Sequence, residues 1–264
     1  MSEKLLSVEN LTMKFGGLIA IDDLSFSAKK DQITSIIGPN GAGKTTVFNC
    51  LTGFYKATSG SMFLNKDNKS LDLKKFSDFK IAQKAGVART FQNIRLFPQM
   101  SVLENMMVAQ HNKLMMASGF SLLGLINAPS FLKKEKEAKE ISKYWLDIIN
   151  LTNRADDNAG DLPYGDQRKL EIVRAMCIEP HLLCLDEPAA GLNAKESAEL
   201  NKLLKFIQKE KKTGILLIEH DMSVVMGISD HVVVLNYGKK IFEGTAQETK
   251  TSPEVIEAYL GTEE

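Results

Sequence analysis

The sequence predicts a mixed α/β fold with an antiparallel β portion near the N-terminus, a core built on a parallel sheet, and an inserted α-helical subdomain. Three observations support this prediction. Short apolar segments rich in β-branched residues alternate with helical segments in the first and last thirds of the chain. Residues 101–178 carry mostly helical patterns. A glycine-rich turn separates a buried strand from a helix at residues 38–45.

The first 37 residues are expected to be strands. Apolar positions recur at Leu6, Val8 and Leu11, and alternation resumes over residues 24–28 after a turn at Gly16-Gly17. Residues 33–37 (ITSII) are short and apolar, as in a strand that is buried on both faces. We expect a helix over residues 43–51 and a further strand over residues 60–64.

The middle of the chain is predicted to be helical. Ser101 can cap the helix that opens this region, and an apolar stripe runs from Ile141 to Ile149 at helical spacing. The charged run over residues 133–140 is interpreted as a solvated helix face. Methionines cluster between Met100 and Met116, and they are typical either of an adaptable surface or of core filling.

The last third alternates again between strands and helices. We expect strands at 182–185, 214–218, 232–235 and 239–243, the last two paired, and helices at 195–210 and 253–260. The chain is therefore interpreted as a single domain over residues 1–264. Its core spans about 1–92 and 180–264, and its helical subdomain spans about 93–179.

Composition narrows the functional classes. The numbers of Lys+Arg and of Asp+Glu are both 33, so the basic excess of a duplex-binding protein is missing and we expect no nucleic acid partner. Three cysteines without close pairing favour reduced thiols, as in the cytosol. The N-terminus lacks a signal-peptide core, and the apolar stretch from Phe120 to Ala128 is shorter than the about 20 residues of a membrane-spanning helix.

The glycine-rich turn matches the phosphate-binding pattern G-x-x-x-x-G-K-[ST]. Its glycines allow backbone N–H groups to face phosphate oxygens, and the helix that follows adds its N-terminal dipole. Lys44 can reach the β- and γ-phosphates, and Thr45 can ligate Mg²⁺. The nucleotide-binding residues predicted here are Gly38, Pro39, Asn40, Gly41, Ala42, Gly43, Lys44, Thr45 and Thr46.

Two acidic residues end the apolar strand at 182–185. Asp186 can hold Mg²⁺ through water beside the phosphate loop. Glu187 can polarise a water molecule that attacks the γ-phosphate, which is what hydrolysis requires.

With these motifs, the chain resembles the ATP-binding subunits of ABC transporters over nearly its whole length. The resemblance implies that Gln92 (in TFQN) closes on Mg²⁺ and nucleotide and that His220 (in IEHD) contacts the γ-phosphate. It also implies that Phe15 stacks on adenine. Residues 190–193 (AGLN) match the loop after the acidic pair, although Asn193 replaces a usual aspartate.

The signature segment departs from the family pattern Leu-Ser-Gly-Gly-Gln, since residues 162–166 read LPYGD. Gly165 at the start of the following helix is retained, and the resemblance implies that this helix end caps the γ-phosphate bound to the opposite subunit. Pro163 lacks the serine hydroxyl, Tyr164 replaces a glycine, and Asp166 adds an acid. A weaker contact is therefore expected.

Several segments are similar to one subfamily, the branched-chain amino acid importer ATPases: LPYG at 162–165, LDEPAAGLN at 185–193, IEHDM at 218–222 and AYLG at 258–261. The resemblance implies an ATP- and Mg²⁺-dependent motor, peripheral at the cytoplasmic face of the inner membrane. Its partners would be a second ABC ATPase subunit (a related chain or a second copy), transmembrane permeases, and indirectly a solute-binding protein. Phe97, Met100 and Met106 are expected near the groove that receives a permease helix.

Three alternatives remain open at this point. The chain could drive another ABC system, such as lipopolysaccharide export or urea import. It could be a soluble ABC ATPase acting on ribosomes or DNA, although the tandem domains or long coiled coil of those proteins are missing. It could also be a P-loop kinase of small molecules, which would not need Gln92, the signature helix and His220 together.

Overall fold

The structure is a computed structural model that describes residues 3–66, 69–117 and 129–260. Contacts divide it into two compact units, residues 1–92 with 180–264 and residues 93–179. The apolar stretch from Phe120 to Ala128 lies outside the described residues. Within the described ranges, no helix combines the length and apolar character needed to span a bilayer.

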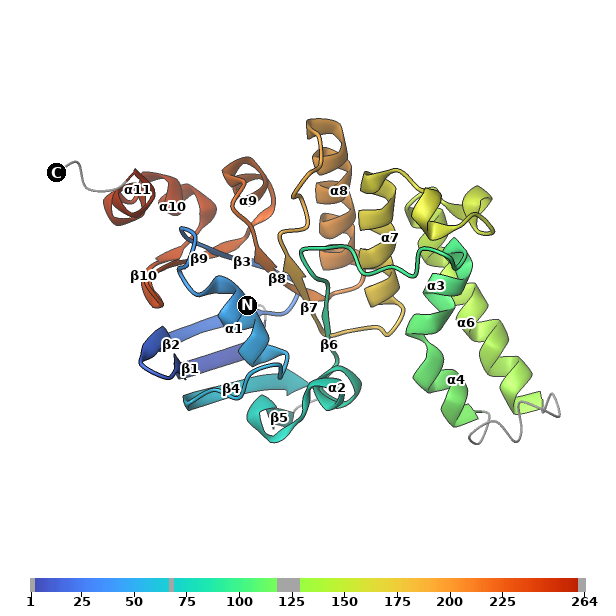
Figure 1. Cartoon of the computed structure of the whole chain (residues 1–264), viewed down its shortest axis with the longest axis horizontal. Coiled ribbons are helices and arrows are strands. Elements are labelled where there is room, and N and C mark those ends of the chain that lie inside the picture. The colour runs from blue at the N-terminus through green and yellow to red at the C-terminus, as the bar shows by residue number, and fades with distance from the viewer. Residues whose placement is uncertain (1–2, 67–68, 118–128, 261–264) are drawn as a thin grey trace. The chain divides into compact units, whose positions relative to one another are not determined.

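The first unit contains a six-stranded sheet in the order β10-β9-β3-β8-β7-β6, parallel except for the β9–β10 pair (Figure 1). Every residue of β3, β7 and β8 is buried, which explains their continuous apolar sequences. The strands are β3 (Ile33–Ile37), β6 (Val87–Arg89), β7 (Leu182–Asp186), β8 (Gly214–Ile218), β9 (His231–Asn236) and β10 (Lys239–Gly244). The predicted parallel core and its antiparallel last strand are confirmed.

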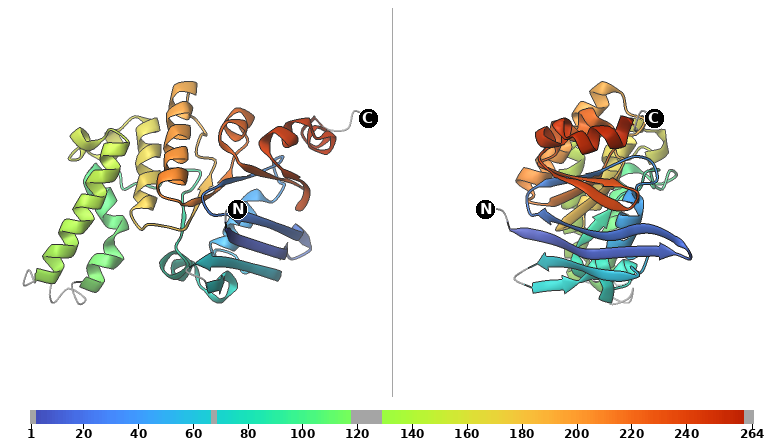
Figure 2. Two further views of the ribbon diagram at one scale, coloured as in Figure 1. Left: turned by 180° about the vertical axis from the view of Figure 1, so that it is seen from behind. Right: turned by 90° about the vertical axis from the view of Figure 1, so that its left-hand side faces the viewer.

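A four-stranded antiparallel sheet in the order β2-β1-β4-β5 accompanies it. In the right-hand view of Figure 2, its blue strands form a layer below the orange and red strands of the other sheet. Its strands are β1 (Lys4–Phe15), β2 (Leu18–Lys29), β4 (Ser59–Lys66) and β5 (Lys69–Asp72). β1 and β2 are longer than the predicted segments because register shifts carry their pairing past the breaks in alternation.

One apolar cluster joins the two sheets through helix α1. Leu6 and Leu64 of the antiparallel sheet, Phe48 of α1, and Ile36 and Leu216 of the parallel sheet all belong to it and are fully buried. The helices of this unit are α1 (Lys44–Leu51), α2 (Asp78–Lys80), α8 (Ala194–Glu210), α9 (Met222–Ile228), α10 (Ala246–Thr251) and α11 (Pro253–Leu260). Short helical turns cover Leu73–Lys75 and Ile81–Ala85.

The second unit is helical, as predicted. Ser101 forms a capping box with Glu104 at the start of its first helix. The charged run over 133–140 lies mostly exposed on α6, with ion pairs such as Lys139–Glu135 (2.8 Å). Met106 is fully buried, so it packs in the core of this unit and does not line a surface groove. The helices are α3 (Val102–Ala109), α4 (His111–Ala117), α6 (Pro129–Ile148) and α7 (Tyr164–Met176), with short turns at Thr152–Arg154 and Ala159–Asp161.

The three cysteines, Cys50, Cys177 and Cys184, are free and buried, as expected from their number and spacing. Burial raises the pKa of Cys184 to about 12 and that of Cys50 to about 11.

Candidate functional site

The phosphate loop connects β3 to α1 and depends on glycine at two positions of close approach. Gly43 has φ +97°, and a Cβ there would lie 2.6 Å from the Ala20 carbonyl oxygen. A Cβ at Gly38 would lie 2.1 Å from the carbonyl oxygen of Leu235. A side chain at either position would therefore displace the loop from the neighbouring strands.

The N-terminus of α1 is arranged to receive an anion. Gly43 caps the helix without a side-chain hydrogen bond, and the first N–H group that bonds back along the helix is that of Val47, to the Gly43 carbonyl (3.0 Å). The N–H groups of Lys44, Thr45 and Thr46 lie in the first turn, where no helical acceptor is available. Together with the helix dipole, they fit phosphate oxygens.

The Lys44 ammonium lies inside the loop. The residue is 7% exposed, and Nζ donates to the carbonyls of Gly38 (2.7 Å) and Pro39 (3.0 Å). Burial lowers the pKa of Lys44, while the negative charges of Glu187 and Asp186 act in the opposite direction. A partly desolvated cation held by two carbonyls in a polar loop is suited to bind phosphate.

A pocket of about 460 Å³ extends from this loop. Its lining combines Lys44, Thr45 and Glu187 with apolar side chains. Phe15 is 40% exposed there and makes an edge-to-face contact with Tyr55 (centroids 5.1 Å apart), so part of its ring is accessible to a base. The lining residues are Phe15, Leu18, Ile19, Ala20, Asn40, Gly41, Ala42, Gly43, Lys44, Thr45, Thr46, Glu187, Tyr237 and Gly238.

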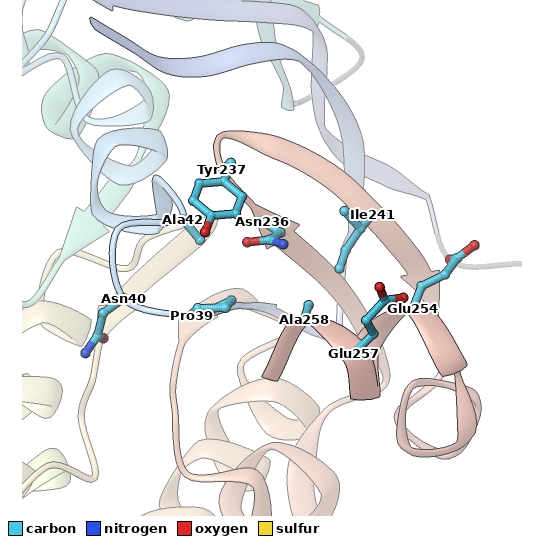
Figure 3. Close-up of a pocket in the computed structure, with 9 residues that line it drawn as sticks. All are labelled: Pro39, Asn40, Ala42, Asn236, Tyr237, Ile241, Glu254, Glu257 and Ala258. Carbon is cyan, nitrogen blue, oxygen red and sulfur yellow. The ribbon is translucent and has the colours of Figure 1, made fainter. Parts of the chain in front are cut away.

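Two of the predicted loop residues lie outside this pocket. Gly38 is at the base of the loop, where its carbonyl accepts from Lys44. Pro39 lines a neighbouring pocket of about 600 Å³ with Asn40, Tyr237, Glu254 and others (Figure 3). The phosphate-binding sequence motif includes Gly38 and Pro39 together with the residues that line the pocket. Only the course of the folded loop shows which of them line it.

Three predicted catalytic side chains come together after the carboxyl ends of neighbouring strands. Glu187 follows β7, Gln92 follows β6, and His220 follows β8. Glu187 Oε2 accepts a hydrogen bond from Gln92 Nε2 (2.7 Å) and lies 3.6 Å from His220 Nδ1. Glu187 has φ +49°, a strained backbone conformation of the kind often found at functional sites. This edge of a parallel sheet is where α/β proteins bind ligands.

Asp186 has a partner that the sequence analysis missed. Its Oδ2 accepts from Arg89 Nη2 (2.8 Å), and both side chains are almost fully buried. Arg89 Nη1 also donates to Asn49 (2.6 Å) and Thr52 (3.2 Å). The guanidinium lies 5.0–5.7 Å from the ring centroids of Phe48, Phe54 and Phe91. The sequence did contain a signal for this pair, namely Arg89 within a short apolar strand, because a buried arginine requires an acidic partner.

The available donors fit Mg²⁺. Thr45 is exposed at the pocket and supplies a hydroxyl, whereas Asp186 does not line the pocket and supplies a buried carboxylate whose Oδ2 already pairs with Arg89. Mg²⁺ prefers such oxygen ligands and completes its shell with waters and substrate phosphates.

Gly165 lies in the other unit, in the first turn of α7. This helix begins at Tyr164, one residue earlier than predicted, and Pro163 precedes it without a side-chain cap. Asp166 pairs with Lys169 (2.9 Å). Tyr164 packs its ring over the fully buried Arg168 and its hydroxyl accepts from Nη2 (3.3 Å), which gives the unusual tyrosine a structural role.

Asn193 acts as the N-cap of α8. Its Oδ1 accepts from the N–H groups of Lys195 and Glu196 (both 3.0 Å), and Glu196 completes a capping box. Asparagine and aspartate cap helices about equally well, so the departure from the usual aspartate preserves this local structure.

Two family models match the chain: that of the ABC transporter covers residues 21–190, and that of the branched-chain amino acid ATP-binding cassette transporter covers residues 239–264. The chain is 49% identical over 261 residues to the high-affinity branched-chain amino acid transport ATP-binding proteins BraF of Pseudomonas aeruginosa and LivG of Escherichia coli, with 99% of each chain covered.

Solved structures agree with these matches. A nucleotide-free ATP-binding cassette from an ABC transporter is 31% identical with a TM-score of 0.81, over 98% of this chain and 99% of that one. A cassette in its ADP conformation is 30% identical with a TM-score of 0.82, over 98% and 100%. Sequence and fold lead to one conclusion: the chain belongs to the ABC transporter family of ATP-binding proteins.

Proposed function

We infer that this chain is the ATP-hydrolysing motor subunit of an ABC importer for branched-chain amino acids. The observation that carries this conclusion is the 49% identity to BraF and LivG over 99% of each chain, which includes the C-terminal segment matched by the branched-chain family model. The pocket at the phosphate loop contains groups that suit ATP, because its lining combines Lys44 and the start of α1 with the Phe15 ring.

Different side chains of this chain carry out separate parts of ATP hydrolysis. Glu187 accepts the proton of the attacking water, and Gln92 and His220 orient its carboxylate and the γ-phosphate. Thr45, Asp186 and Gln92 would hold Mg²⁺, which when bound neutralises phosphate charge. Positioning and electrostatics carry most of the catalysis in phosphoryl transfer, which suits a site of fixed backbone and charge.

Assembly completes the proposed motor. A second ATPase subunit, either a related chain or another copy, would present the N-terminus of its α7 helix at Gly165 to the nucleotide held by this chain. Transmembrane permeases would contact the helical unit near Phe97 and Met100, which are 47% and 37% exposed. A solute-binding protein would act indirectly, and the chain would lie peripherally at the cytoplasmic face of the inner membrane.

Affinity purification of a tagged chain from detergent-solubilised native membranes tests this function. We expect two different permeases and a related ATPase, identified by mass spectrometry. Phe97→Asp is expected to reduce permease recovery by about tenfold or more, as for an interface anchor, while ATP binding persists.

Leu132→Asp is the matched control, because Leu132 is also 47% exposed in the helical unit but lies on α6, outside the segment that carries Phe97 and Met100. Recovery of export-type permeases would assign the motor to another ABC system. Recovery of ribosomal proteins or DNA-repair factors without any permease would reject the transport function.

A further inference from the structure

The hairpin of β9 and β10 closes with a turn that does not suit its sequence. Asn236 pairs with Lys239, so the loop between them is Tyr237-Gly238. Both residues have positive φ, +45° and +77°, which defines a type I′ turn. This turn favours Asn-Gly, and a bulky residue in its first position is strained.

The turn is held against the phosphate loop and β2. The Gly238 N–H donates to the Ala42 carbonyl (3.1 Å), and the Gly238 carbonyl accepts from the Asp22 N–H (3.0 Å). A Cβ at Gly238 would lie 2.8 Å from the Ala20 carbonyl oxygen, so the approach to β2 is close. Figure 3 shows the Tyr237 ring at the tip of the hairpin, next to the phosphate loop at Ala42.

The Tyr237 side chain is 87% exposed in this strained position. It lines the nucleotide pocket together with Phe15, Leu18 and Ile19, and it also borders the neighbouring pocket. In the part of the chain that the structure describes, its ring and hydroxyl have no hydrogen bond or ring contact that would offset the strain. The two Gly238 hydrogen bonds hold the turn in its positive-φ conformation, and the exposed Tyr237 ring remains available to a ligand in the pocket.

We propose that Tyr237 is a binding residue for the nucleoside part of ATP, providing a second aromatic surface beside Phe15. The inference rests on the proposed nucleotide site. The turn is bonded both to the phosphate loop at Ala42 and to β2, the strand that supplies the apolar Leu18 and Ile19 to the pocket lining. An aromatic face packs on any base or on a ribose, so the contact adds affinity without hydrogen-bond readout.

Titration calorimetry of the full chain with ATP and with inorganic tripolyphosphate tests this role. Tyr237→Asn removes the ring and places a favoured residue in the turn, so we expect a higher Tm together with an about five- to tenfold weaker Kd for ATP. Tripolyphosphate affinity should remain within twofold, because Lys44 and the N–H groups of the phosphate loop are unchanged. Tyr237→Phe keeps the ring and should bind ATP within about twofold of the unaltered chain.

The other outcomes overturn the inference. An unchanged ATP Kd in Tyr237→Asn would show that the ring has no role at the nucleotide. The same holds if the substitution weakens only self-association of the chain, because the ring would then be a protein contact. An equal loss for ATP and tripolyphosphate would mean that the turn acts only by shaping the loop. If the unaltered chain binds neither ligand, or if Lys44→Ala binds both normally, the proposed nucleotide site itself fails.

Discussion

Replacing Glu187 by glutamine is expected to lower ATP turnover by about 10²–10⁴-fold while ATP binding persists. Glutamine keeps the size of the side chain and can still bond to Gln92, which contacts Glu187 at 2.7 Å, but it cannot accept a proton from water. Phosphate release measures the loss of turnover, and calorimetry measures the retained affinity. Where two copies of the chain close around ATP, hydrolysis would separate them, so the variant should also remain dimeric in ATP on gel filtration.

Glu210→Gln is the matched control for this prediction. Glu210 is an exposed glutamate at the end of α8 that does not line the nucleotide pocket, and its neutralisation should leave turnover within twofold. Turnover that stays near the unaltered rate in Glu187→Gln would show that another group accepts the proton. A loss of ATP affinity equal to the loss of turnover would instead assign Glu187 to binding.

Arg89→Met is expected to destabilise the chain by about 3–5 kcal/mol, because it leaves the buried Asp186 carboxylate without its cation. Asn49 and Thr52 lose their donor as well, and the three phenylalanine rings lose the guanidinium they surround. At about 2–4 °C per kcal/mol, the melting temperature should fall by roughly 6–20 °C in a thermal scan. Lysine at this position should recover only part of the loss, since it cannot bond to several groups in one plane.

The double variant Arg89→Met with Asp186→Asn separates the charge pair from packing. Removing both charges should restore most of the lost stability, because the main cost of the single change is an unpaired buried charge. Arg154→Met is the exposed control, since the Arg154–Asp157 pair (2.7 Å) is solvent-accessible and should contribute at most about 1 kcal/mol. If Arg89→Met melts within 2 °C of the unaltered chain, the buried pair does not stabilise this fold.

Structural elements that depend on residues close together along the chain could be predicted from the sequence. The phosphate loop depends on glycines and a lysine within eight positions, and the buried strands β3, β7 and β8 are continuous apolar runs. The prediction missed α9 (Met222–Ile228) and α10 (Ala246–Thr251), because helices of seven and six residues complete fewer than two turns and show no periodic pattern. Their caps, Asp221 and Thr245, were the local signals that could have revealed them.

The sequence by itself determined the phosphate loop, the continuous buried strands and the family to which the chain belongs, since each depends on motifs of residues close together along the chain. Only the tertiary structure decided which distant groups meet. Arg89 reaches Asp186 across 97 positions because β6 and β7 are adjacent parallel strands. Tyr237 reaches the phosphate loop because β9 lies beside β3. Both contacts follow from strand pairing, which a local sequence pattern does not encode.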